Sequence, residues 1–526
     1  MFDILIKDAL IYDGSGNKPF IGYIAVEGEK ISAIGAGAPE NENAKKVVDA
    51  KGLALSPGFI DVHSHSDRTI NINPHREQVL RMGVTTEIAG QCGSSRSPVA
   101  ETMPPEAYDF LFKGGKFSFT TMQEQLDHLN TLPLGPNQCY FTGHNILRGN
   151  AMGLQARDAT PEEIEIMQKH LALSQQQGSW GVSTGLSYVP GIYCNGHELA
   201  MLGKTAGENG GMYTTHSRSE SMGLFDSVKE CIRVAREGNV PVNISHFKCV
   251  GKVFWQRCEE ALAMIDDAIA EGLNITLDAY PYIACSTTTL SAIPARFLEH
   301  GSEAFVKSLD DPDVVEEIRK EIYEINDPSW DNSMYYVGLE NFLIVRANET
   351  PWAVGKTYAD AAKELGMEPF YGMIHLLKAN HAKISEVRFA MCEENVEMIL
   401  KHPRCMVGSD GIYIPGDQSC HPRAFGTFPR YLGYYIRQRG ILTREEGIHR
   451  ITGMPAQVYG LKNKGLIKQG YDADLVLFAY DNIIDGGDFE DPFKPNEGIH
   501  QVYMAGQLVL EDNEPTGNWC GKYLTK

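Results

Sequence analysis

An apolar run leads directly into two histidines in the stretch Pro57-Gly58-Phe59-Ile60-Asp61-Val62-His63-Ser64-His65. Side chains of a β-strand alternate between its two faces, so His63 and His65 are expected to point the same way. From about Ser56 onward, short apolar runs alternate with helical patterns, which is typical of consecutive βαβ units. The stretch therefore predicts the first strand of a parallel barrel, with two imidazoles at its carboxyl end.

Eight apolar segments after residue 56 are candidate barrel strands. Amphipathic helical patterns separate most of them, and one such pattern starts at Thr160-Pro161-Glu162-Glu163, a sequence suited to an N-cap with a capping box. Eight strands, each usually followed by a helix, predict an α/β chain folded as a (β/α)8 TIM-like barrel. The candidate strands are Phe59–His63, Val84–Ala89, Gln138–Thr142, Gly181–Thr184, Met212–Thr215, Pro241–Ser245, Asn274–Asp278 and Cys405–Val407.

The two ends of the chain have a different sequence pattern, with short strand-like runs separated by turns. Residues 1–56 and 461–526 are therefore expected to join into one small β-sandwich domain beside a barrel of residues 57–460. About 125 residues separate the last two strand candidates, and structureless loops of that length are uncommon. This length predicts an inserted subdomain at about 287–348, placed as a lid over the carboxyl face of the barrel.

The formal net charge of -21, from 68 acidic and 47 basic residues, argues against a nucleic-acid or anionic-membrane surface. The sequence contains neither a signal-peptide pattern nor an apolar run long enough to span a membrane. We therefore expect a cytoplasmic protein whose 11 cysteines are free thiols and whose partner is a small-molecule substrate. The oligomeric state does not follow from the sequence.

Four further residues with metal-binding or acid–base side chains follow other strand candidates: Cys92, His216, His246 and Asp410. Each alone could be unremarkable, since free cysteines are usually inert core residues and Asp-Gly is a frequent turn. Carboxyl ends of barrel strands share one face, so these residues are expected to meet His63 and His65 there. Four imidazoles and a thiol on one face predict a zinc site.

Zinc at such a site lowers the pKa of a bound water toward about 7. Asp410 is the candidate catalytic residue and an additional metal ligand, because a carboxylate beside that water can accept its proton and deliver it to a leaving amine. The predicted reaction is hydrolysis of a C–N bond, and no Gly-x-Ser-x-Gly motif suggests a serine nucleophile.

These motifs resemble the amidohydrolase superfamily. Many of its members carry a bridging Lys or Glu after the fourth strand, whereas Gly181–Tyr188 contains neither, and the resemblance implies that Cys92 takes the bridging position. This is the pattern of the N-acyl-D-amino-acid deacylase (D-aminoacylase) branch. Other matching segments are Gly143-His144, Ser183–Leu186, Asp278–Tyr282, His421–Arg423 and Gly426–Arg430.

The resemblance implies a tightly held zinc on Cys92, His216 and His246, and a second, weaker site on His63 and His65. Cys92 and Asp410 lie near both sites in that family, and the tight metal alone supports activity. The implied reaction releases a carboxylate and a free D-amino acid from a linear N-acyl-D-amino acid.

The resemblance also implies that Lys248, Tyr280, Ser286 and Arg423 bind the substrate α-carboxylate, with Tyr188 lining the pocket. An Arg fork suits a carboxylate because it donates two parallel hydrogen bonds. The segment Gly411–Cys420 is two residues longer than this family leads us to expect, so the preferred side chain and acyl group stay open.

Two alternatives remain at this stage. Another amidohydrolase, acting on a cyclic amide or a dipeptide, is disfavoured by the Cys at position 92. A non-catalytic zinc-binding relative is expected to lose ligands, whereas every expected ligand and Asp410 are present.

Overall fold

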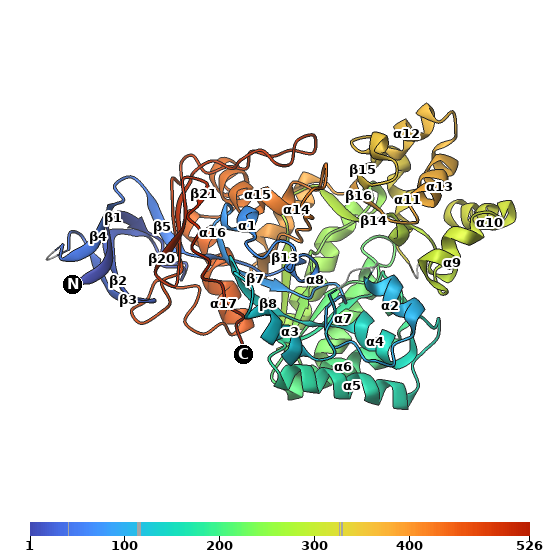
Figure 1. Cartoon of the computed structure of the whole chain (residues 1–526), viewed down its shortest axis with the longest axis horizontal. Coiled ribbons are helices and arrows are strands. Elements are labelled where there is room, and N and C mark those ends of the chain that lie inside the picture. Colours follow the sequence, from blue (N-terminus) through green and yellow to red (C-terminus); the bar gives the residue numbers. More distant parts are fainter. Residues whose placement is uncertain (40–41, 113–116, 326, 328–329) are drawn as a thin grey trace.

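The computed structural model describes residues 1–39, 42–112, 117–325, 327 and 330–526. A β-domain, a central barrel and an inserted α/β unit follow one another across the molecule (Figure 1). None of the helices in these described ranges is long and apolar enough to cross a membrane. The cytoplasmic location stays a prediction.

The two chain ends share one nine-stranded sheet with the order β21-β20-β19-β18-β5-β1-β2-β3, in which β4 also pairs with β1. The ends meet where β18 runs antiparallel to β5, with Leu475 opposite Pro57 and Phe478 opposite Ala54. Apolar side chains from both ends, including Ile24 and Leu477, form the core of this domain. Its strands are β1 (Phe2–Ile11), β2 (Phe20–Glu27), β3 (Lys30–Ala36), β4 (Ala44–Asp49), β5 (Ala54–Pro57), β18 (Leu475–Phe478), β19 (Ile499–Met504), β20 (Gln507–Glu511) and β21 (Glu514–Pro515).

Parallel strands form the barrel in two arcs, β6-β7-β8 and β9-β10-β11-β12-β13-β17. The third barrel strand is shared by β8 and β9, which Phe141 separates. Between the eighth strand and the first, Ser64 bridges Gly411 and the Asp410 amide donates to the His63 carbonyl at 2.7 Å. The predicted (β/α)8 architecture is confirmed. The strands are β6 (Phe59–Asp61), β7 (Val84–Ala89), β8 (Asn137–Tyr140), β9 (Thr142–Gly143), β10 (Gly181–Gly185), β11 (Met212–His216), β12 (Val242–Ile244), β13 (Ile275–Ala279) and β17 (Cys405–Val407).

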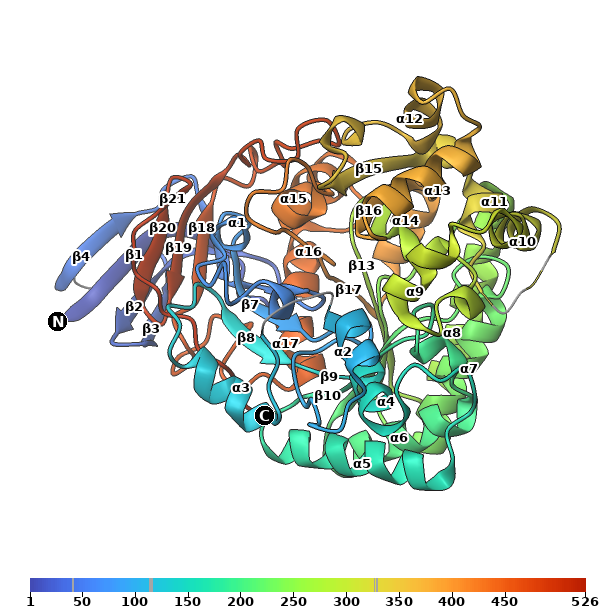
Figure 2. The same cartoon turned by 45° about the vertical axis from the view of Figure 1, so that its right-hand side comes forward.

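Helices connect the barrel strands and surround them (Figure 2). The helix that begins after Thr160 has the expected capping box, because the Thr160 and Glu163 side chains each accept from the other's backbone amide. The helices outside the inserted unit are α1 (Glu77–Leu80), α2 (Pro105–Phe112), α3 (Met122–Leu129), α4 (His144–Met152), α5 (Pro161–Gln176), α6 (Gly196–Glu208), α7 (Leu224–Gly238), α8 (Cys258–Ala270), α14 (Glu393–Lys401), α15 (Arg423–Arg430), α16 (Arg444–Ile451) and α17 (Gly453–Tyr459).

The inserted unit between β13 and β17 contains an antiparallel sheet of order β14-β16-β15. Its residues Phe305, Ile318 and Phe342 belong to an apolar core that also contains Ala107 and Phe112 of α2. Its sheet extends beyond the expected 287–348, since β14 begins at Ala284 and β16 ends at Phe389. The domain boundaries themselves remain predictions. The elements are β14 (Ala284–Thr288), β15 (Phe342–Ala347), β16 (Ile384–Phe389), α9 (Gly301–Ser308), α10 (Pro312–Tyr323), α11 (Ser333–Val337), α12 (Tyr358–Glu364) and α13 (Pro369–Ala379).

Candidate metal centre and active site

The six residues predicted to bind metal all lie at the carboxyl ends of barrel strands. His63 and His65 follow β6, Cys92 follows β7, His216 ends β11, His246 follows β12 and Asp410 follows β17. All are buried except His216, which is partly exposed. The strand topology thus collects side chains from five separate segments on one face of the barrel.

Three of these residues have left-handed backbone conformations, with φ of 54° at Cys92, 36° at His246 and 49° at Asp410. Non-glycine residues rarely adopt such angles, which cost about 1–3 kcal/mol each and concentrate at functional sites. Surrounding hydrogen bonds hold them in place; for example, the His246 amide donates to Asp278 Oδ1 at 2.8 Å. The sharp turns let the side chains leave the strand ends toward a common centre.

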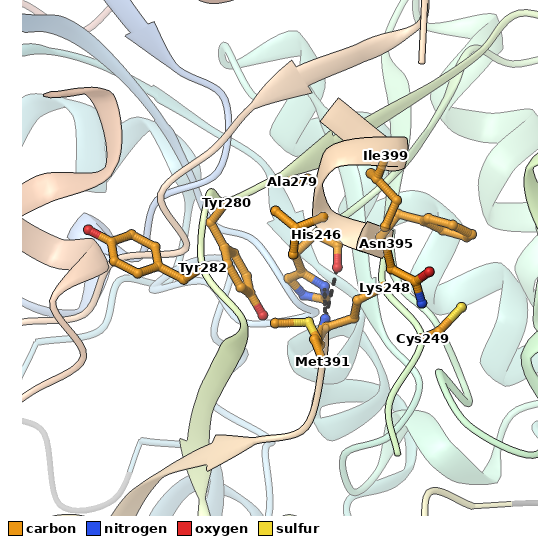
Figure 3. A pocket seen from close by; sticks show the side chains of 11 residues that line it. His246, Lys248, Cys249, Ala279, Tyr280, Tyr282, Met391, Asn395 and Ile399 are labelled. Atoms are coloured by element: carbon orange, nitrogen blue, oxygen red, sulfur yellow. Dashed lines mark hydrogen bonds between the residues drawn. The ribbon is translucent and has the colours of Figure 1, made fainter. Parts of the chain in front are cut away.

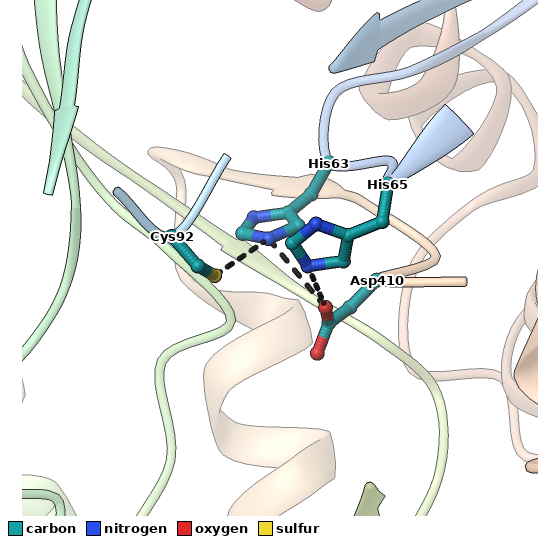
Figure 4. Close-up of side chains that lie close together, drawn as sticks. All are labelled: His63, His65, Cys92 and Asp410. Atoms are coloured by element: carbon teal, nitrogen blue, oxygen red, sulfur yellow. Dashed lines mark hydrogen bonds and ion pairs between the residues drawn. The ribbon is translucent and has the colours of Figure 1, made fainter. Parts of the chain in front are cut away.

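Cys92 belongs to two groups of possible metal ligands, one with His216 and His246 and the other with His63, His65 and Asp410. Within each group the donor atoms lie within 4.8 Å of one another. Cys92 Sγ is 3.3 Å from His63 Nε2 and 3.4 Å from His246 Nε2, and His65 Nε2 is 3.0 Å from Asp410 Oδ1 (Figure 4). A thiolate with two imidazoles suits zinc and leaves one tetrahedral position open.

Charge around the centre favours ionised ligands. Burial opposes ionisation of Cys92, but the imidazoles of His63 and His246 outweigh it and hold the thiol pKa well below its usual value. Burial also opposes ionisation of Asp410, whereas Arg423 and the nearby histidines hold its pKa well below the usual range. Both groups are therefore anions suited to a cation between them.

Buried carboxylates behind the ligands were not predicted from the sequence. Asp278 Oδ1 lies 3.4 Å from His63 Nδ1. Asp61 accepts from the Ser409 amide at 2.8 Å and from the Ser409 hydroxyl at 2.5 Å. Such outer carboxylates orient ligands and fix imidazole tautomers. The signal was present in the sequence, because Asp61 and Asp278 lie near the carboxyl ends of otherwise apolar strand candidates.

Arg423 brings a buried guanidinium next to the metal groups. Its Nη2 lies 2.8 Å from Asp410 Oδ2 and 3.2 Å from the Ser286 carbonyl. Lys248 approaches from another strand end, and both cations lie over the Tyr280 ring, at 4.6 Å for Arg423 and 5.7 Å for Lys248. Lys248 and Tyr280 also line part of a cavity of about 10 Å³ (Figure 3).

The other two expected substrate contacts lie near this centre but already have partners. The Ser286 hydroxyl donates to the Glu386 carbonyl at 2.8 Å. The Tyr188 hydroxyl lies 3.1 Å from Thr287 Oγ1, while its ring is 4.8 Å from the His216 ring. Tyr188 therefore packs beside a candidate metal ligand.

Hydrogen-bonding capacity is left over at this centre. Within the described part of the chain, Arg423 Nε, Arg423 Nη1 and the Tyr280 hydroxyl are buried without a hydrogen-bond partner. Buried polar groups are nearly always paired in proteins. Because no described part of the polypeptide accepts a hydrogen bond from these donors, they indicate a polar ligand that is rich in hydrogen-bond acceptors.

The amidohydrolase family model matches residues 46–510. A D-aminoacylase from Alcaligenes xylosoxydans xylosoxydans is 32% identical over 100% of this chain and 98% of its own length. The chain belongs to the amidohydrolase family. An N-acyl-D-aspartate deacylase from the same organism is 33% identical over 98% of this chain and 93% of its own. The expected resemblance to N-acyl-D-amino-acid deacylases is confirmed.

Comparison with solved structures gives the same family assignment. A crystal structure of D-aminoacylase superposes with a TM-score of 0.85 at 31% identity, covering 100% of both chains. The N-acyl-D-glutamate deacylase of Bordetella bronchiseptica, solved with zinc and a phosphonate that mimics the tetrahedral intermediate, gives 0.84 at 29% identity, again over 100% of both chains. L-Hydantoinase from Arthrobacter aurescens shares the fold, with a TM-score of 0.59 at 15% identity over 100% of both chains.

Another buried group of metal-binding residue types, His144, Cys194 and Glu198, lies elsewhere in the barrel. The Glu198 carboxylate is 2.6 Å from His144 and 2.5 Å from Arg148, and Arg218 lies 3.5 Å from Cys194 Sγ. Burial raises the pKa of the Cys194 thiol to about 12. Two guanidinium groups and a neutral thiol disfavour a metal cation, so we interpret this group as a structural network.

Proposed function

We propose that this protein hydrolyses the amide bond of N-acyl-D-amino acids and releases a carboxylate and a free D-amino acid. The observation that carries the proposal is the buried guanidinium of Arg423, which pairs with Asp410 and keeps Nε and Nη1 unpaired among the described residues. A free α-carboxylate on an N-acyl amino acid can accept a charge-assisted hydrogen bond from such an unpaired N–H group. The names of the relatives supply the D configuration.

The residues that would hold zinc are Cys92, His216 and His246 for a tight site, and His63 with His65 for a weaker one. The donor set supports this assignment, because a thiolate and two imidazoles are ligands that zinc prefers. When bound, zinc supplies a Lewis acid that polarises a carbonyl and lowers the pKa of water.

The chain's own groups account for proton transfer and substrate orientation. Asp410 is held as a carboxylate by Arg423 and the histidines, so it can accept a proton from water and return it to the leaving nitrogen. Arg423 and Tyr280 orient the substrate carboxylate through their unpaired donors. Lys248 adds positive charge, while Tyr188 beside His216 lines the pocket.

Amine release from matched N-acetyl-D- and N-acetyl-L-amino acids, measured with zinc-loaded protein, tests this proposal. We expect turnover of D substrates and little of their L counterparts. Turnover confined to L substrates, or turnover of neither series with zinc bound, contradicts it.

A further inference from the structure

Glu220 lies in the loop after β11, with its carboxylate buried behind the metal groups. Its Oε1 is 2.5 Å from Lys248 Nζ and 3.2 Å from His246 Nδ1. The Val250 amide donates to the Glu220 carbonyl at 2.7 Å and so joins this loop to the one after β12. The Glu220 carboxylate thus contacts His246, a metal-binding residue proposed above, and Lys248, a substrate-binding residue proposed above.

The position of the imidazole proton on His246 decides what Glu220 does. His246 Nδ1 lies 2.8 Å from Lys248 Nζ as well as 3.2 Å from Glu220. An ammonium only donates, so a bond from Lys248 to Nδ1 requires Nδ1 to accept and leaves the proton on Nε2. Nε2 is the atom 3.4 Å from Cys92 Sγ, and a protonated Nε2 cannot bind a metal.

The alternative tautomer suits the metal. With its proton on Nδ1, His246 donates to Glu220 and presents the lone pair of Nε2 toward Cys92. Lys248 then donates to Glu220 Oε1 and to the His246 carbonyl, which lies 2.8 Å away. One of its three N–H groups is left for a substrate carboxylate. Glu220 is the acceptor that allows both hydrogen bonds, one from His246 Nδ1 and one from Lys248 Nζ.

Asp331 of the inserted unit, in the segment between α10 and α11, holds the Glu220 loop. It accepts from the hydroxyls of Ser219 and Ser221, both at 2.5 Å. It also accepts from the amide of Glu220 at 2.8 Å and from the amide of Ser221 at 3.2 Å. These bonds fix the backbone on which the Glu220 carboxylate is carried.

We propose that Glu220 is a positioning residue that selects the Nδ1-protonated form of His246 and orients Lys248, and that Asp331 holds the Glu220 loop for this task. The inserted unit thus contributes to the metal centre. This inference rests on the proposed function for the role of Lys248, but its metal part is independent of the substrate.

The test compares Glu220→Gln, Glu220→Ala and Asp331→Asn with Glu230→Gln. The last variant is a matched control, because Glu230 pairs at 3.0 Å with Arg218 of the same loop. The zinc dissociation constant is measured by competition with a chromophoric chelator, and the His246 tautomer by NMR of zinc-loaded protein with ¹⁵N-labelled histidine. Removal of a residue that hydrogen-bonds a metal ligand weakens metal binding about 10–100-fold. We therefore expect the zinc affinity of Glu220→Ala to fall by that factor, and the zinc affinity of Asp331→Asn to fall by less.

Glu220→Gln keeps the shape and one acceptor oxygen, so it is expected to retain more zinc affinity than Glu220→Ala while raising KM through the misplaced Lys248. Unchanged zinc affinity in Glu220→Ala and Glu220→Gln, with the Nδ1 proton retained, overturns the role of Glu220. Wild-type zinc affinity in Asp331→Asn overturns the role of Asp331. Failure of the proposed function instead appears as absent D-substrate turnover in a wild-type protein that binds zinc and shows these affinity losses.

Discussion

Arg423 and Asp410 form a buried ion pair, with Nη2 of the guanidinium 2.8 Å from Oδ2 of the carboxylate. The pair uses only Nη2 of the guanidinium, and Nε and Nη1 have no partner among the described residues. Arg423 can therefore donate an unpaired N–H to a substrate carboxylate while its Nη2 still holds Asp410. In the proposed function, binding of the substrate and placement of the proton acceptor thus depend on the same side chain.

Replacing Asp410 by Asn is expected to remove the proton acceptor and leave Cys92, His216 and His246 intact as ligands. General acid–base groups contribute about 10²–10⁴-fold to rate, so we expect kcat to fall by about that factor. Metal analysis should find zinc still bound in Asp410→Asn. A wild-type rate in this variant would remove Asp410 from the mechanism.

Arg423→Ala is expected to raise KM for N-acyl amino acids by roughly 10–100-fold, because a hydrogen bond to a charged group contributes about 1.5–3 kcal/mol. The loss of the Asp410 partner adds a smaller fall in kcat. The matched substrate is the corresponding N-acyl amino acid amide, which lacks the α-carboxylate. Wild-type protein should discriminate strongly against it, and an equal discrimination in Arg423→Ala would place the carboxylate elsewhere.

Cys92→Ser tests the sulfur that both ligand groups share. A hydroxyl is a much poorer zinc ligand than a thiolate. Loss of a residue that only hydrogen-bonds a ligand already lowers metal affinity about 10–100-fold. Loss of the ligand itself should therefore weaken zinc binding by more than about 100-fold. Retention of tight zinc by Cys92→Ser, judged by chelator competition, would show that the thiolate is not a ligand.

The group formed by His144, Cys194 and Glu198 should behave as structure. Arg148→Met leaves Glu198 buried without its guanidinium, 2.5 Å away in the intact protein, and breaking such a pair costs about 3–5 kcal/mol. We expect a large drop in thermal stability, whereas Cys194→Ala should keep the wild-type zinc content. A lower zinc content in Cys194→Ala would identify a further metal site.

Much of the barrel follows from local patterns. The eight apolar segments and the Thr160 capping box depend on residues close in sequence, so alternation and helical spacing were sufficient to predict them. The extent of the inserted sheet was harder, because β14 and β16 pair across about 100 residues of chain and neither strand shows in its own sequence which segment it pairs with.

The metal-binding residue types stood out because His and Cys repeated at the ends of successive strands are typical of a metal site and rare in core packing. The sequence did not reveal the Arg423–Asp410 pair or the proposed roles of Glu220 and Asp331, since they depend on loops that meet only in the folded chain. The left-handed turns at Cys92, His246 and Asp410 were equally hidden, because these residue types carry no requirement for a positive φ.

The most direct measurement adds zinc stepwise to metal-free protein in a racemic N-acetyl amino acid and resolves the released amino acid by chiral chromatography. We predict that only the D enantiomer is released, at a rate that rises with zinc and depends on Cys92. Release in the absence of zinc, or release of the L enantiomer, would contradict the proposed function.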